Sequence, residues 1–369
     1  MKYLLINVVA GMGSTGKMAA DQCRQLEKQG HRCVLAYGRG ISGCQDIQTR
    51  PIGGKLDYQL HALSSRLLDN QGFCSKRATR EFLRWVRQYD PDVIWLHNLH
   101  GYYLNLPLLF GYLKSCGKEI VWTLHDCWSF TGHCAHFAYA GCQKWKTGCC
   151  RCPEKGSYPK SVGLDQSRRN YQRKRELFTG IPNLHLVLPS HWMEGHVAQS
   201  FLKDYPREVV YNPIDREIFR PTPSRFRQDH GLEHEKIVLG VAGVWGQRKG
   251  LQDLLELSRL LPEGYRLVLV GLNQKELAAI PENVLGLPRT QNLRQLAEIY
   301  TAADVYVNPS PEESFGMTTL EARCCGTAAV VYQDTACQEV VEAFGGTAVP
   351  RGAENLLQAV LDVTKEREP

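Results

Sequence analysis

The stretch VYVNPSPEESFGMTTLEARCCG, residues 305–326, decides the fold class of this sequence. It begins with a short β-branched apolar run, passes through a loop rich in Pro, Ser and Glu, and continues as a helical pattern up to Gly326. A short buried strand followed directly by a loop and a helix is half of a βαβ unit, which builds parallel sheets. We therefore expect an α/β chain.

The same alternation of apolar runs and helical stretches extends along the chain and starts afresh after Pro206. A turn-rich link with prolines at 213, 221 and 223 accompanies this restart. We predict two doubly wound domains, residues 1–207 and 208–369, whose strand ends face one shared cleft. Strands are expected at residues 3–9, 32–37, 93–96, 120–124, 184–188, 237–242, 266–270, 305–307 and 328–331, with helices such as 251–261 and 293–302 between them.

The length and composition of the chain fit this organisation. With 369 residues, 43% of them hydrophobic and 22% charged, the chain suits two globular domains and excludes long disorder and fibrous repeats. The N-terminal apolar run is too short to span a membrane and lacks the features of a signal peptide. A cytoplasmic protein is predicted.

The positive charge of the chain is concentrated in one segment. Ten basic and three acidic residues lie between Gly141 and Gly180, a balance of +7 against +6 for the whole chain. This patch indicates a local anionic partner more than general affinity for nucleic acid, although a solvated helical face would explain it equally well.

Seven of the fourteen cysteines fall between Cys116 and Cys152. Four of them, Cys134, Cys142, Cys149 and Cys152, lie within 19 residues, the last two as a CxxC pair. Thiolates at such spacing can hold a structural zinc ion, and reduced loop cysteines are the alternative.

The first Gly-rich loop, Gly11–Lys17, follows a predicted strand and fits the GxxxxGK pattern of nucleoside-triphosphate P-loops. Met18 stands where that motif needs a Ser or Thr to hold Mg²⁺, which argues against an ATPase. The glycines Gly13 and Gly16 can still present backbone amides to a phosphate, or form a tight turn without a ligand.

Three further loops follow predicted strands and carry polar residues. His125 and Asp126 emerge side by side after residues 120–124, where His125 could contact a substrate hydroxyl or be structural. Arg248 and Lys249, in the loop after the first strand of the second domain, are suited to clamp a diphosphate.

Glu313 and Glu321 are eight residues apart, one in a loop and one inside the helix that follows. Both can face a ligand that lies over the helix N-terminus, where amides near Ser314, Phe315 and Gly316 suit phosphate oxygens. Taken alone, Glu321 could equally belong to a solvated helix face.

In combination these segments resemble the family 4 glycosyltransferases of GT-B architecture, over most of the sequence. The resemblance is carried by the Glu313 to Glu321 spacing ahead of Cys325-Gly326, with Lys249-Gly250, the NPID segment 212–215 and Pro309-Ser310. Residues 13–17 and 123–132, with the cysteine cluster, are similar to a subgroup found in bacterial exopolysaccharide and colanic-acid-type gene sets.

The resemblance implies two facing Rossmann-like domains, an acceptor-binding one with a Cys-rich insertion at about residues 127–160 and a nucleotide-sugar-binding one. It implies that Glu313 holds the donor sugar, Glu321 the nucleotide ribose, and His125 a donor-sugar hydroxyl. Lys249 would neutralise the departing diphosphate. Arg248 is expected to replace an Arg that the family often places directly after Gly243, where this chain has Val244.

The resemblance implies a retaining, metal-independent hexosyltransferase that uses a UDP- or GDP-sugar in exopolysaccharide or capsule biosynthesis. Its acceptor would be a glycan or a polyprenyl-diphosphate-linked glycan, reached by peripheral contact with the inner face of the cell membrane. Two alternatives are a nucleotide-sugar epimerase, which the Glu313 to Glu321 spacing disfavours, and a zinc-stapled protein whose basic face binds nucleic acid.

Overall fold

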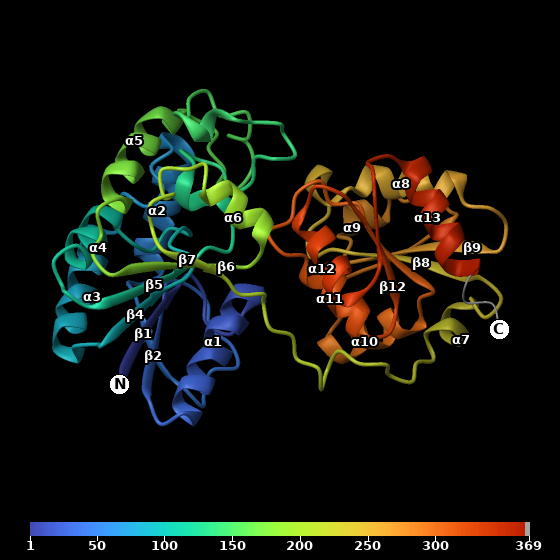
Figure 1. Ribbon diagram of the computed structural model, residues 1–369, viewed down its shortest axis with the longest axis horizontal. Helices are drawn as coiled ribbons and strands as arrows, with labels where there is room; N and C mark the ends of the chain where they lie inside the picture. The colour runs from blue at the N-terminus through green and yellow to red at the C-terminus, as the bar shows by residue number, and fades with distance from the viewer. Residues whose placement is uncertain (366–369) are drawn as a thin grey trace. The chain divides into compact units, whose positions relative to one another are not determined.

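The computed structural model describes residues 1–365 and divides the chain into two compact units, one from Met1 to Val210 and one that begins at Tyr211 (Figure 1). Each unit is an α/β fold around its own parallel sheet. The α/β prediction with two doubly wound sheets is confirmed. No helix within residues 1–365 combines the length and the apolar character needed to cross a bilayer.

The N-terminal unit has a seven-stranded parallel sheet in the order β3-β2-β1-β4-β5-β6-β7. Its strands are β1 Lys2–Asn7, β2 Arg32–Tyr37, β3 Gln48–Pro51, β4 Val93–Leu96, β5 Glu119–Thr123, β6 Leu184–Leu188 and β7 Arg207–Val209. Its helices are α1 Gly13–Lys28, α2 Lys55–Leu68, α3 Lys76–Tyr89, α4 Leu106–Leu113, α5 Ser167–Phe178 and α6 His191–Val197.

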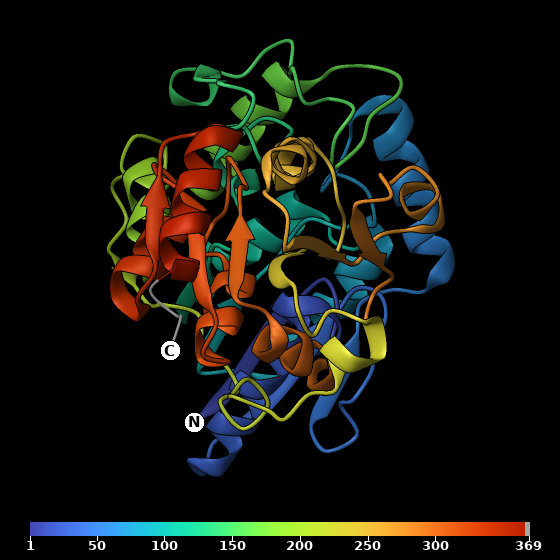
Figure 2. The same ribbon diagram turned by 90° about the vertical axis from the view of Figure 1, so that its right-hand side faces the viewer.

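The C-terminal unit has a six-stranded parallel sheet in the order β10-β9-β8-β11-β12-β13, with helices on both faces (Figure 2). Its strands are β8 Lys236–Val241, β9 Tyr265–Val270, β10 Val284–Leu287, β11 Val305–Asn308, β12 Ala328–Tyr332 and β13 Thr347–Val349. Its helices are α7 Phe226–His230, α8 Leu251–Leu260, α9 Gln274–Leu277, α10 Leu293–Ala302, α11 Met317–Cys324, α12 Ala336–Phe344 and α13 Ala353–Lys365.

The central strands read as continuous apolar runs because both of their faces are buried. In β8, Ile237 and Leu239 pack into one core cluster, whereas Val238 between them packs into another on the opposite face. In β1, Leu4 and Leu5 divide in the same way. Helices pack on both faces of each sheet and complete these cores.

Four strands, β3, β7, β10 and β13, have no counterpart among the predicted strands. All four lie at the edges of the two sheets. Edge strands are short and partly exposed, so their sequence signal is weak. β3, for example, reads QTRP and lacks the apolar run that marks a central strand.

The segment between β5 and α5 contains no strand and has two short 3₁₀ turns, η1 Cys127–Phe130 and η2 Lys144–Lys146. Cys127, Cys134 and Cys149 are nevertheless part of the main core of the N-terminal unit. This segment therefore packs onto the unit through its own apolar side chains.

Both sheets reverse their strand order next to their first strand. The reversal falls between β1 and β4 in one sheet and between β8 and β11 in the other. In doubly wound sheets, ligands bind in the crevice outside the carboxyl ends of the strands at such a switch point. The loops after these four strands are therefore where a site is expected.

Candidate functional site

The loop after β8 approaches the loop after β11 through Gly250. This residue has a φ of 65°, and a Cβ built on it would lie 2.3 Å from the carbonyl oxygen of Pro309. Only glycine combines this left-handed conformation with such a close approach. The short 3₁₀ turn η3, Gln247–Lys249, which precedes Gly250, is thereby held against the β11 loop.

Three of the predicted site residues meet at this junction. Lys249 Nζ forms an ion pair with Glu313 Oε1, and Arg248 Nη1 lies 3.8 Å from Glu313 Oε2. Arg248 also donates a hydrogen bond of 3.2 Å to the carbonyl oxygen of Glu312. The Glu313 side chain is only 11% exposed, so it lies largely buried beside two cations.

The predicted residues Ser314, Phe315 and Gly316 lead directly into α11. Gly316 has a φ of 98°, and a Cβ on it would lie 2.5 Å from Cys337 Sγ. No side chain at this N-cap accepts a hydrogen bond from the first turn of α11. Phe315 is buried and packs on Tyr211, with 5.5 Å between the ring centroids. Phe315 thus anchors the turn, and its side chain does not face a ligand.

Asn308 fixes the shape of this loop from inside. Its Oδ1 accepts a 3.2 Å hydrogen bond from the Ser310 amide, and its Nδ2 donates one of 3.1 Å to Thr319 Oγ1 on α11. The loop before α11 and the helix itself are therefore held in one arrangement.

Glu321 lies on α11 and is held by a residue that the sequence did not single out. Tyr300, at the end of α10 and fully buried, donates a 3.0 Å hydrogen bond from its hydroxyl to Glu321 Oε2. A carboxylate placed by a buried tyrosine is a pre-arranged acceptor, which favours a binding role over a solvated helix face.

Arg351, after β13, is a further cation that sequence reasoning missed. Its Nη2 donates a 3.0 Å hydrogen bond to the carbonyl oxygen of Pro311, so it reaches the loop that carries Glu313. The sequence around Arg351 contains no motif that marks it. Arg351 lies near the loop that carries Glu313 because β13 pairs with β12.

In the N-terminal unit, His125 lines a pocket formed by residues that follow β4 and β5. Its Nε2 lies 3.0 Å from Nδ1 of His97. Burial lowers the pKa of His125 to about 4, although nearby Asp126 opposes this shift. Burial also lowers the pKa of His97 far below its usual value. Both rings are therefore neutral at pH 7 and share one hydrogen bond.

A second polar chain in this pocket was not predicted. Asp126 Oδ2 accepts a 2.8 Å hydrogen bond from His100 Nε2, and His100 Nδ1 lies 2.9 Å from the hydroxyl of Tyr158. Burial alone would raise the pKa of Asp126, but His100 and the Trp128 amide outweigh it and hold this pKa far below its usual value. The ionised Asp126 carboxylate therefore accepts the hydrogen bond from His100 Nε2.

Gly13 and Gly16 lie at the turn from β1 into α1. The Gly11 amide donates a 2.9 Å hydrogen bond to the Gly16 carbonyl oxygen. A Cβ on Gly16 would lie 2.9 Å from a methyl group of Val9. Gly13 is exposed, has a φ of 61°, and opens α1 without a side-chain cap. Binding of an anion by the amides of this turn stays a prediction.

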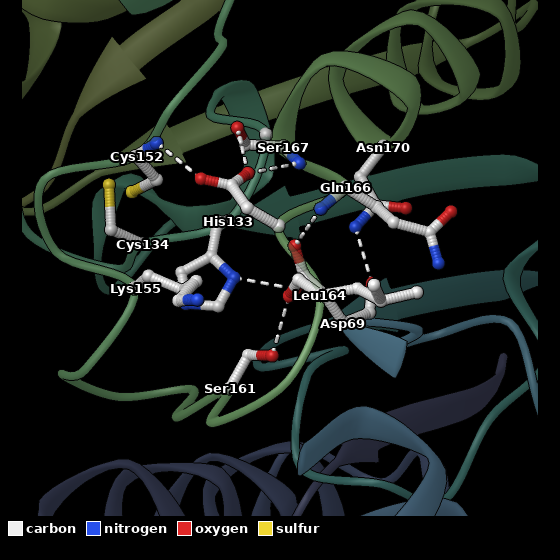
Figure 3. Close-up of polar contacts among 12 residues, drawn as sticks. Asp69, His133, Cys134, Cys152, Lys155, Ser161, Leu164, Gln166, Ser167 and Asn170 are labelled. Atoms are coloured by element: carbon white, nitrogen blue, oxygen red, sulfur yellow. Dashed lines mark hydrogen bonds and ion pairs between the residues drawn. The ribbon is translucent and has the colours of Figure 1, made fainter. Parts of the chain in front are cut away.

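The four cysteines of the predicted zinc site, Cys134, Cys142, Cys149 and Cys152, line one small cavity. Figure 3 shows the sulfur atoms of Cys134 and Cys152 side by side. Cys149 Sγ accepts a 3.2 Å hydrogen bond from the Gly132 amide. In the part of the chain that the structure describes, no three His, Cys, Asp or Glu side chains are arranged to hold a metal ion. The zinc prediction is therefore not confirmed.

The basic segment 141–180 contributes less surface charge than its sequence indicates. Lys174 is buried, and its Nζ donates hydrogen bonds of 2.5 and 3.0 Å to the carbonyl oxygens of Trp128 and Thr131. Burial lowers its pKa to about 7. Lys174 therefore fixes the segment after β5 and does not belong to a surface patch.

Comparisons with known proteins identify the family of the chain. The model of the family described as "Glycosyltransferase Family 4" matches residues 15–218, and that of "Glycosyl transferases group 1" matches residues 224–369. The "Putative colanic acid biosynthesis glycosyl transferase WcaC" of Escherichia coli (strain K12) is 28% identical over 98% of this chain and 89% of its own length.

Two solved structures show the same fold. The sucrose-phosphate synthase of Thermosynechococcus elongatus superposes with a TM-score of 0.71 at 16% identity, over 99% of this chain and 90% of that one. The Anabaena protein Alr3699/HepE in complex with UDP-glucose gives a TM-score of 0.67 at 15% identity, over 99% and 90% of the two chains.

Proposed function

The chain belongs to Glycosyltransferase Family 4 and has the GT-B fold, and from this premise we propose its reaction. We propose that it transfers a hexose from a UDP- or GDP-sugar with retention of the anomeric configuration. The acceptor is a glycan or a polyprenyl-diphosphate-linked glycan of a bacterial surface polysaccharide, either an exopolysaccharide or a capsule. The similarity to WcaC over nearly the whole chain supports this acceptor class.

The observation that carries the proposal is the meeting of Glu313 with Lys249 and Arg248 at the switch point of the C-terminal sheet. We assign donor binding to this unit. Breaking the bond between sugar and diphosphate leaves negative charge on the diphosphate, which two cations and the first amides of α11 can stabilise. Glu313 then accepts hydrogen bonds from the sugar hydroxyls beside the reacting centre.

Glu321 has a separate role in this proposal. Its carboxylate, held by Tyr300, accepts hydrogen bonds from the ribose hydroxyls of the nucleotide. The cations Lys249 and Arg248 supply the positive charge that a divalent metal ion supplies in many phosphate-transfer sites. We therefore propose turnover without a catalytic metal.

We assign acceptor binding to the N-terminal unit, with peripheral contact at the inner face of the cell membrane and an otherwise cytoplasmic location. His125, neutral and hydrogen-bonded to His97, is suited to exchange a hydrogen bond with a donor-sugar hydroxyl. The amides of the Gly13 and Gly16 turn are suited to a phosphate of the donor.

The test is donor hydrolysis without acceptor. The purified full chain is incubated with a panel of UDP- and GDP-sugars, and the released nucleoside diphosphate is measured. We expect slow hydrolysis of one donor, lost in Glu313→Gln and kept in the matched control Glu282→Gln, which changes an exposed carboxylate of the same unit. An active Glu313→Gln protein would contradict the assignment of Glu313 to the donor site. If no donor of the panel were hydrolysed, the proposed use of a nucleotide sugar would be contradicted.

We also propose that the cysteine cluster holds a structural zinc ion. The support is that Cys134, Cys142, Cys149 and Cys152 line one cavity and that two of their sulfur atoms are adjacent. The four thiolates would close around the ion as tetrahedral ligands. Metal analysis of protein purified without chelator should give about one zinc per chain. Zinc should be lost in a Cys149→Ser/Cys152→Ser variant and kept in Cys116→Ser. Wild-type protein that purifies without zinc and is no less stable for lacking it would contradict the zinc proposal.

A further inference from the structure

Helix α2 belongs to the N-terminal unit (Figure 1). Its leucines are exposed, so its apolar side faces outward. His61 and Ser65, on the opposite side of the helix, are each only 1% exposed. A helix that merely covers a core buries its apolar stripe and exposes its polar one. The outward side carries Leu56, Leu60, Leu63 and Leu67, spaced by four, three and four residues and exposed by 74%, 68%, 54% and 48%.

Hydrogen bonds of His61 hold this unusual orientation from below. Its Nε2 accepts a 3.0 Å hydrogen bond from the Gly72 amide, so the proton is on Nδ1, which lies 2.8 Å from Ser75 Oγ. Both ring nitrogens are thus satisfied inside the unit. Turning the helix to bury its leucines would break both hydrogen bonds.

The C-terminal end of α2 is fixed as well (Figure 3). Asp69, the residue after the helix, accepts hydrogen bonds of 2.6 Å from His133 Nδ1 and 2.8 Å from the Gln166 amide. Its carbonyl oxygen accepts a third, of 2.6 Å, from Asn170 Nδ2. The helix is therefore tied to both the cysteine-rich segment and α5.

The segment of residues 161–164 extends the apolar surface. The amides of Val162 and Leu164 donate hydrogen bonds of 2.8 and 3.0 Å to the carbonyl oxygens of Arg66 and Leu67. Their side chains are 62% and 55% exposed. We call the combined surface the leucine face, and it comprises Leu56, Leu60, Leu63, Leu67, Leu68, Val162 and Leu164.

Several cations belong to the elements that form the leucine face or adjoin them in the chain. Lys55 and Arg66 belong to α2 itself, and Lys155 Nζ donates a 2.9 Å hydrogen bond to the Gly163 carbonyl oxygen. Lys160 and Arg169 lie in the adjoining part of the chain and are exposed. The acidic residues nearby, Asp57 and Asp165, are engaged with backbone amides, those of Gly54 and of Cys152 and Ser167.

We propose that the leucine face docks the protein onto a lipid bilayer that carries anionic headgroups. Leucines on one side of a helix that lies parallel to the membrane plane can enter the boundary between headgroups and acyl chains, and flanking cations add attraction to anionic lipids. A second copy of this chain would bring a rim of the same charge against the first, which disfavours self-association. The biological reason for docking rests on the proposed function, because a polyprenyl-linked acceptor is itself embedded in a bilayer.

Co-sedimentation of the full chain with vesicles tests the docking directly. We use phosphatidylcholine vesicles with and without about a third of phosphatidylglycerol. We expect binding to the anionic vesicles that is weakened at least about tenfold by Leu60→Gln/Leu63→Gln. The control Leu260→Gln, an equally polar change at an exposed leucine of the other unit (44% exposed), should bind as the wild type does.

Three results would overturn the proposal. They are no vesicle binding by the wild type, equal binding by Leu60→Gln/Leu63→Gln, and a wild-type dimer in sedimentation equilibrium that this variant dissociates. Donor hydrolysis in solution, measured on the same samples, separates this proposal from the reaction. Binding without hydrolysis contradicts the proposed reaction and leaves the docking standing. Hydrolysis without leucine-dependent binding contradicts the docking and leaves the proposed reaction standing.

Discussion

Lys249 and Glu313 form an ion pair although 64 positions separate them in the sequence. The side chains are 20% and 11% exposed, so the pair is largely shielded from solvent. Two adjacent strands, β8 and β11, bring their loops together and create this contact. In the function that we propose, the pair joins an acceptor for sugar hydroxyls to a cation for phosphate oxygens.

The first prediction concerns this pair. Lys249→Met should lower the turnover number for donor cleavage by about 100-fold, because it removes the positive charge that we propose stabilises the departing diphosphate. The matched control Lys275→Met, an exposed lysine of the same unit, should retain activity. In steady-state kinetics, Lys249→Met/Glu313→Gln should be little slower than the slower single variant, because the two residues act as one unit. Independent, multiplicative losses would contradict this coupling.

The second prediction concerns the glycine that allows the contact. Gly250→Ala should lower the free energy of unfolding of the C-terminal unit by about 2 kcal/mol or more. The reason is that alanine disfavours the positive φ of this position and that its Cβ would clash with the Pro309 carbonyl oxygen. Gly264→Ala is the control, because Gly264 has a φ of 84° but no heavy atom within 4 Å of an added Cβ. Denaturant titration should show a clearly smaller loss for Gly264→Ala. Equal losses would mean that the approach to Pro309 is easily relieved.

The central part of this fold could be predicted from the sequence because buried parallel strands are continuous apolar runs. Strands such as β8 and β11 bury both faces and were found, whereas the edge strand β3 bears solvent-exposed polar residues and was not. The loops that carry Lys249 and Glu313 could be predicted for the same reason, since they directly follow apolar runs. Whether a residue follows the end of an apolar run can be read from its immediate neighbours in the sequence.

Other parts of the site depend on contacts that no local pattern encodes. Tyr300 reaches Glu321 only because α10 and α11 are neighbours, and His100 reaches Asp126 across two strands. Lys174 reads as one more positive charge in a basic segment, but burial turns it into a structural residue. Side-chain partners of this kind follow from tertiary packing.

The third prediction tests Tyr300 as the residue that positions Glu321. Tyr300→Phe removes the hydroxyl that donates to the carboxylate and should raise the KM for the donor about tenfold with little change in kcat, because a hydrogen bond to a charged group is worth about 1.5–3 kcal/mol. Tyr306→Phe is the control, since this buried hydroxyl donates to Thr318 Oγ1 and to no carboxylate. A fall in kcat at unchanged KM would place Glu321 at the reacting centre.

The fourth prediction is a loss of stability in mild acid. Burial lowers the pKa of His61 and of His125 to about 4, and that of His97 also lies far below 6.5. Because the folded pKa values are depressed, the unfolded chain takes up protons first as the pH falls. The stability of the N-terminal unit is therefore complete above pH 6.5 and is lost from there towards pH 4, at a slope of up to about 1.4 kcal/mol per pH unit for each histidine.

Denaturant titrations at pH 7, 6 and 5 measure this slope. His61→Gln should be less stable at pH 7, because it disturbs the hydrogen bonds to Gly72 and Ser75, but its stability should fall less steeply with acid. His191→Gln, at a histidine whose side chain is 67% exposed, should keep the slope of the wild type. If the wild type were equally stable at pH 7 and 5, these histidines could not be buried in their neutral form, because neutral burial requires the unfolded state to bind more protons.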